Sequence, residues 1–311
     1  MVVRGGSIGS PRREMVVDVE VSNLCGLLRS DEPSVRAQGI ALLDLLDPAE
    51  WRGRFAGADL NGVCLGKKKL WGLEFAGANL RGALFSQSDL TGANLAGVFM
   101  VEGLLVGADL TGANLSHADL RHADFSDAIL HRADFQCANL HGVIFQGADL
   151  RQSVLINARV GNANFSGADL RGAHLSGLDL RQASFVGADC GDARMSSARF
   201  CDPISHPSVA RWIGARFAGT DLRYACLEGI QISKPDEDPL FLPNFTGANL
   251  RWADLSGAIL RHGRLEGADL RDADLSRACL ESADLRDADL RNADLTGALM
   301  GGARLQGARL D

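Results

Sequence analysis

The residue types that perform catalysis or hold metal ions are present in this 311-residue chain, but they are not grouped. Histidine and cysteine each occur seven times. No two histidines have the HxxxH spacing of a zinc site, and no two cysteines form a CxxC pair. No glycine-rich phosphate loop joins a strand to a helix. The sequence therefore predicts no enzyme, no metal site and no bound cofactor.

Aspartate is the one chemically active residue type that recurs with a regular spacing. A set of five lies at intervals of 20 or 40 residues, with Ile129 at the missing place: Asp89, Asp109, Asp149, Asp169 and Asp189. If the chain stacks these carboxylates, they form an acidic row on one side of the molecule. Whether they stack depends on the element that carries them.

That element is a five-residue repeat. From Phe55 to Phe200, all 30 residues numbered in multiples of five are apolar, and 17 are Leu and 9 are Phe. The residue two places earlier is Ala in 20 of the 30 repeats, and Asp or Asn usually lies between them. A second array runs from Phe245 to Leu310. A period of five fits neither a helix nor an ordinary strand. It indicates a chain that turns a corner every five residues, with Ala and the central residue inside.

The phenylalanines indicate how many sides each coil has. Eight of the nine central Phe residues in the first array have numbers ending in five. This alternation implies an even number of sides, and a spacing of 20 suggests four. The residues that we expect to stack in the core are Phe85, Phe125, Phe145, Phe165 and Phe185. Successive coils would pair as parallel strands, rising ~4.8 Å each.

The repeat, seen plainly in Ala108-Asp109-Leu110-Thr111-Gly112, resembles that of the pentapeptide-repeat proteins, over about residues 52–311. This resemblance implies an all-β solenoid, a right-handed four-sided β-helix of about twelve coils. The expected parts are a tail and helical cap at 1–50, a first array at 51–200, an irregular segment at 201–244 and a second array at 245–311. Because Lys68 and Leu73 occupy positions of small residues, we expect the coil around them to be distorted.

The resemblance also suggests a partner. Proteins of the family's quinolone-resistance branch are proposed to occupy DNA gyrase as DNA-like rods, so the acidic row could bind DNA gyrase or topoisomerase IV and protect or inhibit it. Charge limits this idea. Duplex DNA has about one charge per 1.7 Å, so each coil would need about three net negative charges. Residues 51–200 instead hold 14 acidic and 14 basic residues.

Two alternatives to gyrase binding therefore stay open. Asp and Asn can serve only to bond turn backbone groups and to keep the faces soluble. The rod can also be a general scaffold that docks a partner on its loops or its N-terminal cap. The net charge of −7 argues against direct nucleic-acid binding, and no apolar run is long enough to span a membrane. Scattered cysteines favour a reducing cytoplasm.

The irregular segment and the two ends carry the remaining predictions. Insertions of about twelve and eight residues would form two proline-rich loops, similar to loops of the quinolone-resistance branch that contact the topoisomerase. The loop residues that we expect to bind a partner are His206, Asp236, Glu237 and Asp238. Residues 34–46 have helical spacing, and residues 15–50 would cap the first coil. Leu295, Met300, Leu305 and Leu310 would form an uncovered last layer, through which two chains pair as a homodimer.

Overall fold

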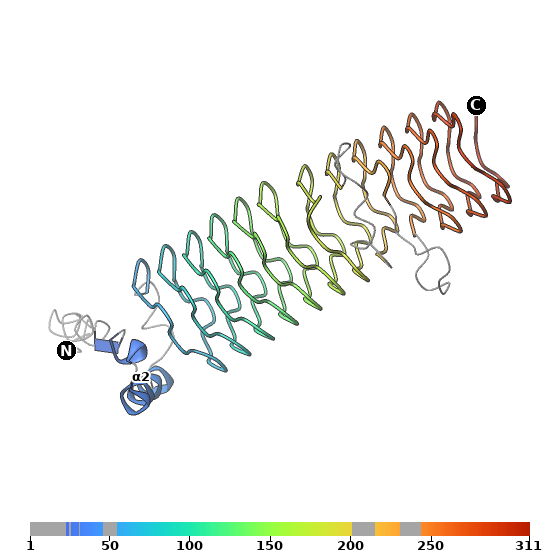
Figure 1. Cartoon of the computed structure of the whole chain (residues 1–311). Helices are drawn as coiled ribbons and strands as arrows, with labels where there is room; N and C mark the ends of the chain where they lie inside the picture. Colours follow the sequence, from blue (N-terminus) through green and yellow to red (C-terminus); the bar gives the residue numbers. More distant parts are fainter. Residues whose placement is uncertain (1–22, 25, 31, 46–54, 201–214, 231–243) are drawn as a thin grey trace, which may run out of the picture.

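The computed structural model describes residues 23–24, 26–30, 32–45, 55–200, 215–230 and 244–311. The repeats wind into a solenoid whose coils follow one another along a straight axis (Figure 1). Parallel bridges join residues 20 apart, such as Asp59 to Asn79 and Cys64 to Leu84. The expected β-helix is confirmed. Because each repeat has five residues and the bridges within each array span 20, the coils of the two arrays have four sides.

We name each face after the first described residue of its row of bridges: the Asp59, Cys64, Lys69 and Glu74 faces. Each row consists of the Asp or Asn positions of the repeat, so one outward side chain per coil lies on each face. The bridges at Cys64, Lys69 and Glu74 are as regular as those that follow. The predicted distortion around Lys68 is therefore wrong, because Leu73 fits inside the coil at 3% exposure.

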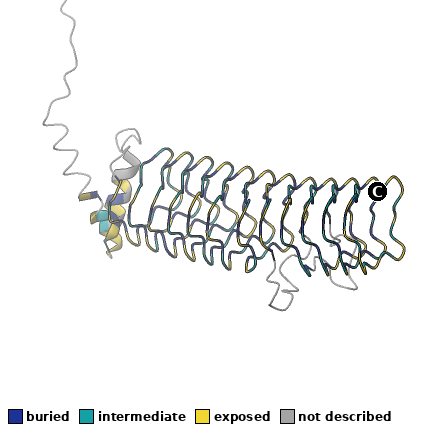
Figure 2. Ribbon diagram, turned by 90° about the horizontal axis from the view of Figure 1, so that it is seen from above, coloured by how far each residue is buried: buried dark blue, intermediate teal, exposed yellow. Residues whose placement is uncertain are grey.

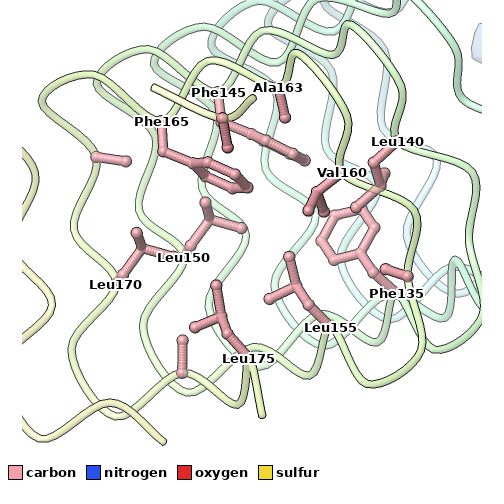
Figure 3. Close-up of a cluster of buried hydrophobic side chains, with 14 of the residues drawn as sticks. Phe135, Leu140, Phe145, Leu150, Leu155, Val160, Ala163, Phe165, Leu170 and Leu175 are labelled. Atoms are coloured by element: carbon pink, nitrogen blue, oxygen red, sulfur yellow. The ribbon is translucent and has the colours of Figure 1, made fainter. Parts of the chain in front are cut away.

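The interior is a solid apolar core. The central Leu and Phe residues and the preceding Ala residues are buried along both arrays (Figure 2), except in the last coil. Phe85, Phe125, Phe145, Phe165 and Phe185 are all completely buried. The Phe145 ring stacks on Phe165 with centroids 5.2 Å apart, and Leu150 and Leu170 lie beside this stack (Figure 3). Small Ala next to large Leu or Phe fills the narrow coil without voids.

The corners explain why glycine is common at one place in the repeat. The second residue after the central residue has a positive φ in nearly all described repeats, as Gly77 does at 68°. Its amide donates to the next coil, with Gly77 N bonding Ala96 O at 2.9 Å. This left-handed conformation is strained for residues with a side chain. Many corners nevertheless carry one, including Tyr224 and Trp252.

The bridges keep the register of the rows across the irregular segment. Asp189 pairs with Arg216, 27 residues on rather than 20, and Arg216 pairs with Asn244, 28 residues on. The insertions are therefore seven and eight residues beyond a full coil. The predicted twelve for the first was wrong, because the bridge from Asp189 to Arg216 spans only seven residues more than a full coil. The inserted residues themselves lie outside the described ranges.

Helix lies at the N-terminal end of the coils, as expected. α2 spans Pro33–Leu45, and residues 26–29 are also helical. Leu24 and Leu28 are completely buried and belong to the same apolar cluster as Phe55 in the first described coil. The Arg29 guanidinium bonds the Asp59 carboxylate. Figure 2 shows these helical residues against the end of the rod.

Candidate protein-interaction faces

The predicted acidic residues lie in one row on the Lys69 face. Bridges join Asp89 to Asp109 and Asp109 to Ile129, and the row continues in the same way through the three remaining aspartates: Asp149, Asp169 and Asp189. All five carboxylates are partly exposed. Because stacked parallel coils repeat at ~4.8 Å, aspartates of adjacent coils form a regularly spaced row of carboxylates.

Each of these carboxylates also bonds the backbone of its own corner. The Oδ1 atom accepts the amide N–H two residues on: from Thr91 at 3.1 Å in the case of Asp89, and from Thr111 at 2.9 Å in the case of Asp109. The same bond recurs at Asp149, Asp169 and Asp189. Asn residues on the other faces make it too, as Asn94 does to Ala96. The repeat therefore uses Asp and Asn to satisfy corner amides throughout.

Arginines neutralise the C-terminal part of the row. Arg151 donates through Nε and Nη2 to both oxygens of Asp149, and Arg171 does the same to Asp169. These hydrogen bonds hold the pKa of both carboxyls below the usual value. Arg216 pairs with Asp189 at 2.8 Å. Among the described residues, only Asp89 and Asp109 in this row lack an ion-pair partner.

The charge of the side chains in this row changes from negative to positive at the irregular segment. The residues that follow Asp189 on the Lys69 face are Arg216, Asn244 and Arg264. Farther along, Asp284 alternates with Arg304. The aspartates of this face are therefore most frequent in the first array, where the row begins with Lys69 and continues with Asp89 and Asp109. The four predicted loop residues lie outside the described ranges: His206, Asp236, Glu237 and Asp238.

The last coil is open. Leu295, Met300 and Leu305 are partly exposed, and Leu310 is 48% exposed. In the coil before, the amide of Leu275 donates to Asp294 O at 2.8 Å. The equivalent amides of the four residues in the last coil have no acceptor among the described residues.

Two surface features were not predicted from the sequence. The Cys64 face is nearly uncharged: Asp124 is its one charged residue in the described ranges, and Leu84, Leu104 and Leu299 are exposed. The spacing of 20 between Leu84 and Leu104 is the sequence signal that could have revealed this face. The second feature is an exposed aromatic pair, Tyr224 and Trp252, with ring centroids 4.9 Å apart. The eight-residue insertion places these residues 28 apart and conceals their alignment.

Within the described residues, no three His, Cys, Asp or Glu side chains are grouped so that they could hold a metal ion. His122 and His141 meet edge to face at 5.8 Å, at the corner between the Asp59 and Cys64 faces. Burial lowers the pKa of His174, and Arg194 adds to the effect. No helix in the described part of the chain is long and apolar enough to cross a membrane.

Comparison with solved structures finds other proteins of this repeat type. HetL from the cyanobacterium Nostoc sp. strain PCC 7120, a pentapeptide repeat protein involved in heterocyst differentiation regulation, is 30% identical; the match covers 84% of this chain and 92% of HetL, with a TM-score of 0.33. QnrB1, a plasmid-mediated fluoroquinolone resistance protein, is 17% identical over 82% of this chain and 92% of its own, with a TM-score of 0.28. A thylakoid-lumen protein of Arabidopsis thaliana is 31% identical over 40% of this chain and 74% of its own, with a TM-score of 0.14.

TM-scores this low carry no argument about shared shape. A search of curated proteins finds no match. The model of the pentapeptide repeats, in contrast, matches eight copies over residues 69–102, 104–142, 133–172, 163–200, 248–287 and 288–311. Because these matches cover more than half of the chain, the protein belongs to the pentapeptide repeat family.

Proposed function

We propose that this protein is a non-catalytic protein-binding rod. The observation that carries the proposal is that the rod has a solid apolar interior and regular rows of side chains on its outer faces. The core is filled with Leu, Phe and Ala, which leaves no room for a substrate. Outside, each face presents one side chain per coil in a fixed row. Rigid repeat surfaces of this kind suit the binding of extended partners.

The partner that we propose is a type II DNA topoisomerase, DNA gyrase or topoisomerase IV, which the rod would protect or inhibit. The support is the acidic row on the Lys69 face together with the two insertions into the coil. Since arginines pair with Asp149, Asp169 and Asp189, the DNA-like part of the row is Asp89 and Asp109. Scattered free cysteines favour the cytoplasm as the site of action.

A supercoiling assay tests this function. Purified rod at micromolar concentration should inhibit gyrase supercoiling or reduce drug-stabilised DNA cleavage. Asp89→Asn combined with Asp109→Asn should weaken that effect, because both changes remove charge and keep a side chain that accepts the corner amide bond. The absence of any effect of the parent protein in either assay would rule out the topoisomerase as partner.

A general scaffold is the second candidate, and the Cys64 face favours it. Leu84 is 36% exposed and Leu104 is 42% exposed on adjacent coils of this face. An uncharged apolar surface does not imitate DNA but suits a protein partner. Leu84→Lys with Leu104→Lys should abolish binding to such a partner and leave any effect on gyrase unchanged.

We also propose that two chains pair through the last coil as a homodimer. Its apolar layer is partly exposed and its amides lack acceptors among the described residues. Pairing about a twofold axis would cover both layers together.

A further inference from the structure

One corner of the rod, between the Glu74 and Asp59 faces, changes from small to aromatic side chains within four coils. Two successive corners carry Ser176-Gly177 and Ser196-Ser197. The next two carry Tyr224 and then Trp252. These positions stack directly, because the Ser197 amide donates to Arg223 O at 2.7 Å and the Tyr224 amide donates to Arg251 O at 3.1 Å.

The aromatic stack ends at Tyr224. The rings of Tyr224 and Trp252 are nearly parallel, at 3°. The Arg251 guanidinium lies 3.9 Å from the Trp252 ring centroid and bonds Asp272 in the following coil. Since Tyr224 covers one face of the indole, Arg251 covers the other. The remaining face in this stack is that of Tyr224, which is 56% exposed.

The space that would continue the stack is open. A Cβ atom added at Gly177 would meet no atom within 4 Å. Ser176 and Ser196 bond each other through their hydroxyls at 3.1 Å. We use the name Tyr224 notch for the corner residues Ser176, Gly177, Ser196 and Ser197 together with the exposed Tyr224 ring that follows them. A planar group here would lie where an aromatic residue of the preceding coil would stack.

The notch is flanked by positive charge. Arg194 lies on the Glu74 face and Arg199 on the Asp59 face, and both are exposed. Neither makes an ion pair with any described residue, whereas Arg223 is bonded through two nitrogens to Asp221. Two exposed guanidinium groups that make no ion pair with a described residue therefore lie on the two faces that meet at this corner.

We propose that the Tyr224 notch binds a nucleoside phosphate. The base stacks on Tyr224, and the phosphate bonds Arg194 and Arg199, whose planar guanidinium groups match phosphate oxygens. Base stacking on aromatic rings is a common source of affinity for nucleotides. Tyr224 and Trp252 hold φ values of 58° and 57°, which disfavour bulky side chains. Local propensity therefore does not account for two aromatic residues at this corner.

The protein's one tyrosine makes the test specific. Protein that carries a fluorinated tyrosine gives a single fluorine NMR signal, and AMP should shift it in a saturable way. Adenosine lacks the phosphate and ribose phosphate lacks the base, so each should bind at least about tenfold more weakly than AMP. Arg194→Gln with Arg199→Gln should reduce the affinity for AMP to that for adenosine. Arg159→Gln, an exposed arginine on the Asp59 face without an ion pair to any described residue, is the matched control.

A second variant blocks the notch itself. Ser197→Trp should fill it and abolish the AMP-dependent shift, and Trp252 shows that this corner position accepts the indole. The proposal is overturned if AMP leaves the signal in place, if ribose phosphate alone gives the full shift, or if Ser197→Trp binds AMP as the parent does. Tighter binding of a phosphotyrosine peptide than of AMP would also overturn the assignment to a nucleotide.

Discussion

At the scale of single residues, the same few contacts recur in every repeat. The inward Ala and Leu or Phe could be predicted from the period of five alone. The sequence also indicates that Asp149 pairs with an arginine, because Asp149-Leu150-Arg151 places an arginine two residues after the aspartate. The pair Asp189–Arg216 could not be predicted, since it depends on how many residues the first insertion adds.

The ion pairs of the second array predict a pH dependence of stability. Hydrogen bonds from Arg286 and Arg291 lower the pKa of Asp284 and of Asp289 to about 2. Their stabilising effect is complete above the unfolded-state pKa of about 3.9 and is lost as the pH falls towards about 2. The melting temperature should therefore fall through this window. Asp284→Asn with Asp289→Asn should be less stable at neutral pH and lose less on acidification; an equal loss would contradict the assignment.

Phe145 tests the core. Its ring stacks on Phe125 at 5.4 Å and Phe165 at 5.2 Å and is completely buried. Phe145→Ala should lower the free energy of unfolding by about 3–5 kcal/mol, and Phe145→Asp by more, because its charge would have no partner. Denaturant unfolding measures both. The outward Phe99, at 39% exposure, is the control, and Phe99→Ala should change stability by about 0.5 kcal/mol or less. Equal effects at Phe99 and Phe145 would contradict the inward placement.

At the scale of elements, the coil and its helical end were predictable, and the register across the insertions was not. The alternation of Phe gave the number of sides because rings stack at a spacing of 20. The helix predicted at residues 34–46 is present as α2, one residue earlier at each end. The predicted size of the first insertion was wrong, because the spacing between two apolar centres does not show how many of the residues between them belong to regular repeats.

The helical end should protect the first coil. Leu24 and Leu28 are buried in the cluster that includes Phe55. Leu24→Asp with Leu28→Asp should expose that layer and its strand edges, and uncovered edges promote self-association. Sedimentation velocity should then detect larger species. Ser34→Asp, at an exposed position of α2, is the control. If the double variant sediments as the control does, the first coil needs no cover.

At the scale of the whole molecule, the rod has four different faces and two different ends. On the Lys69 face aspartates predominate in the first array and arginines in the residues that follow, and the Cys64 face is nearly uncharged along the described coils. The charge balance of the sequence had already excluded imitation of DNA along the full length. In the acidic row of the first array, the carboxylates that pair with no described arginine are those of Asp89 and Asp109.

The open end predicts the assembly. Light scattering should give about twice the 33.0 kDa of one chain. Leu305→Glu with Leu310→Glu should yield monomers, because charges would enter the paired layer. Leu104→Glu, on the side of the rod, should leave the dimer intact. A monomeric parent at every concentration would exclude pairing through the last coil.

The central claim, that a row on one face binds a topoisomerase, is tested most directly by an equilibrium dissociation constant. The measurement compares purified gyrase binding to the parent and to two double variants with equal loss of charge. Asp89→Asn with Asp109→Asn alters the Lys69 face, and Asp254→Asn with Asp274→Asn alters the same repeat position on the Asp59 face. The first should weaken binding about tenfold or more, at about 1.4 kcal/mol per tenfold, and the second should leave it unchanged. Equal effects of the two variants, or no binding by the parent, would contradict the claim.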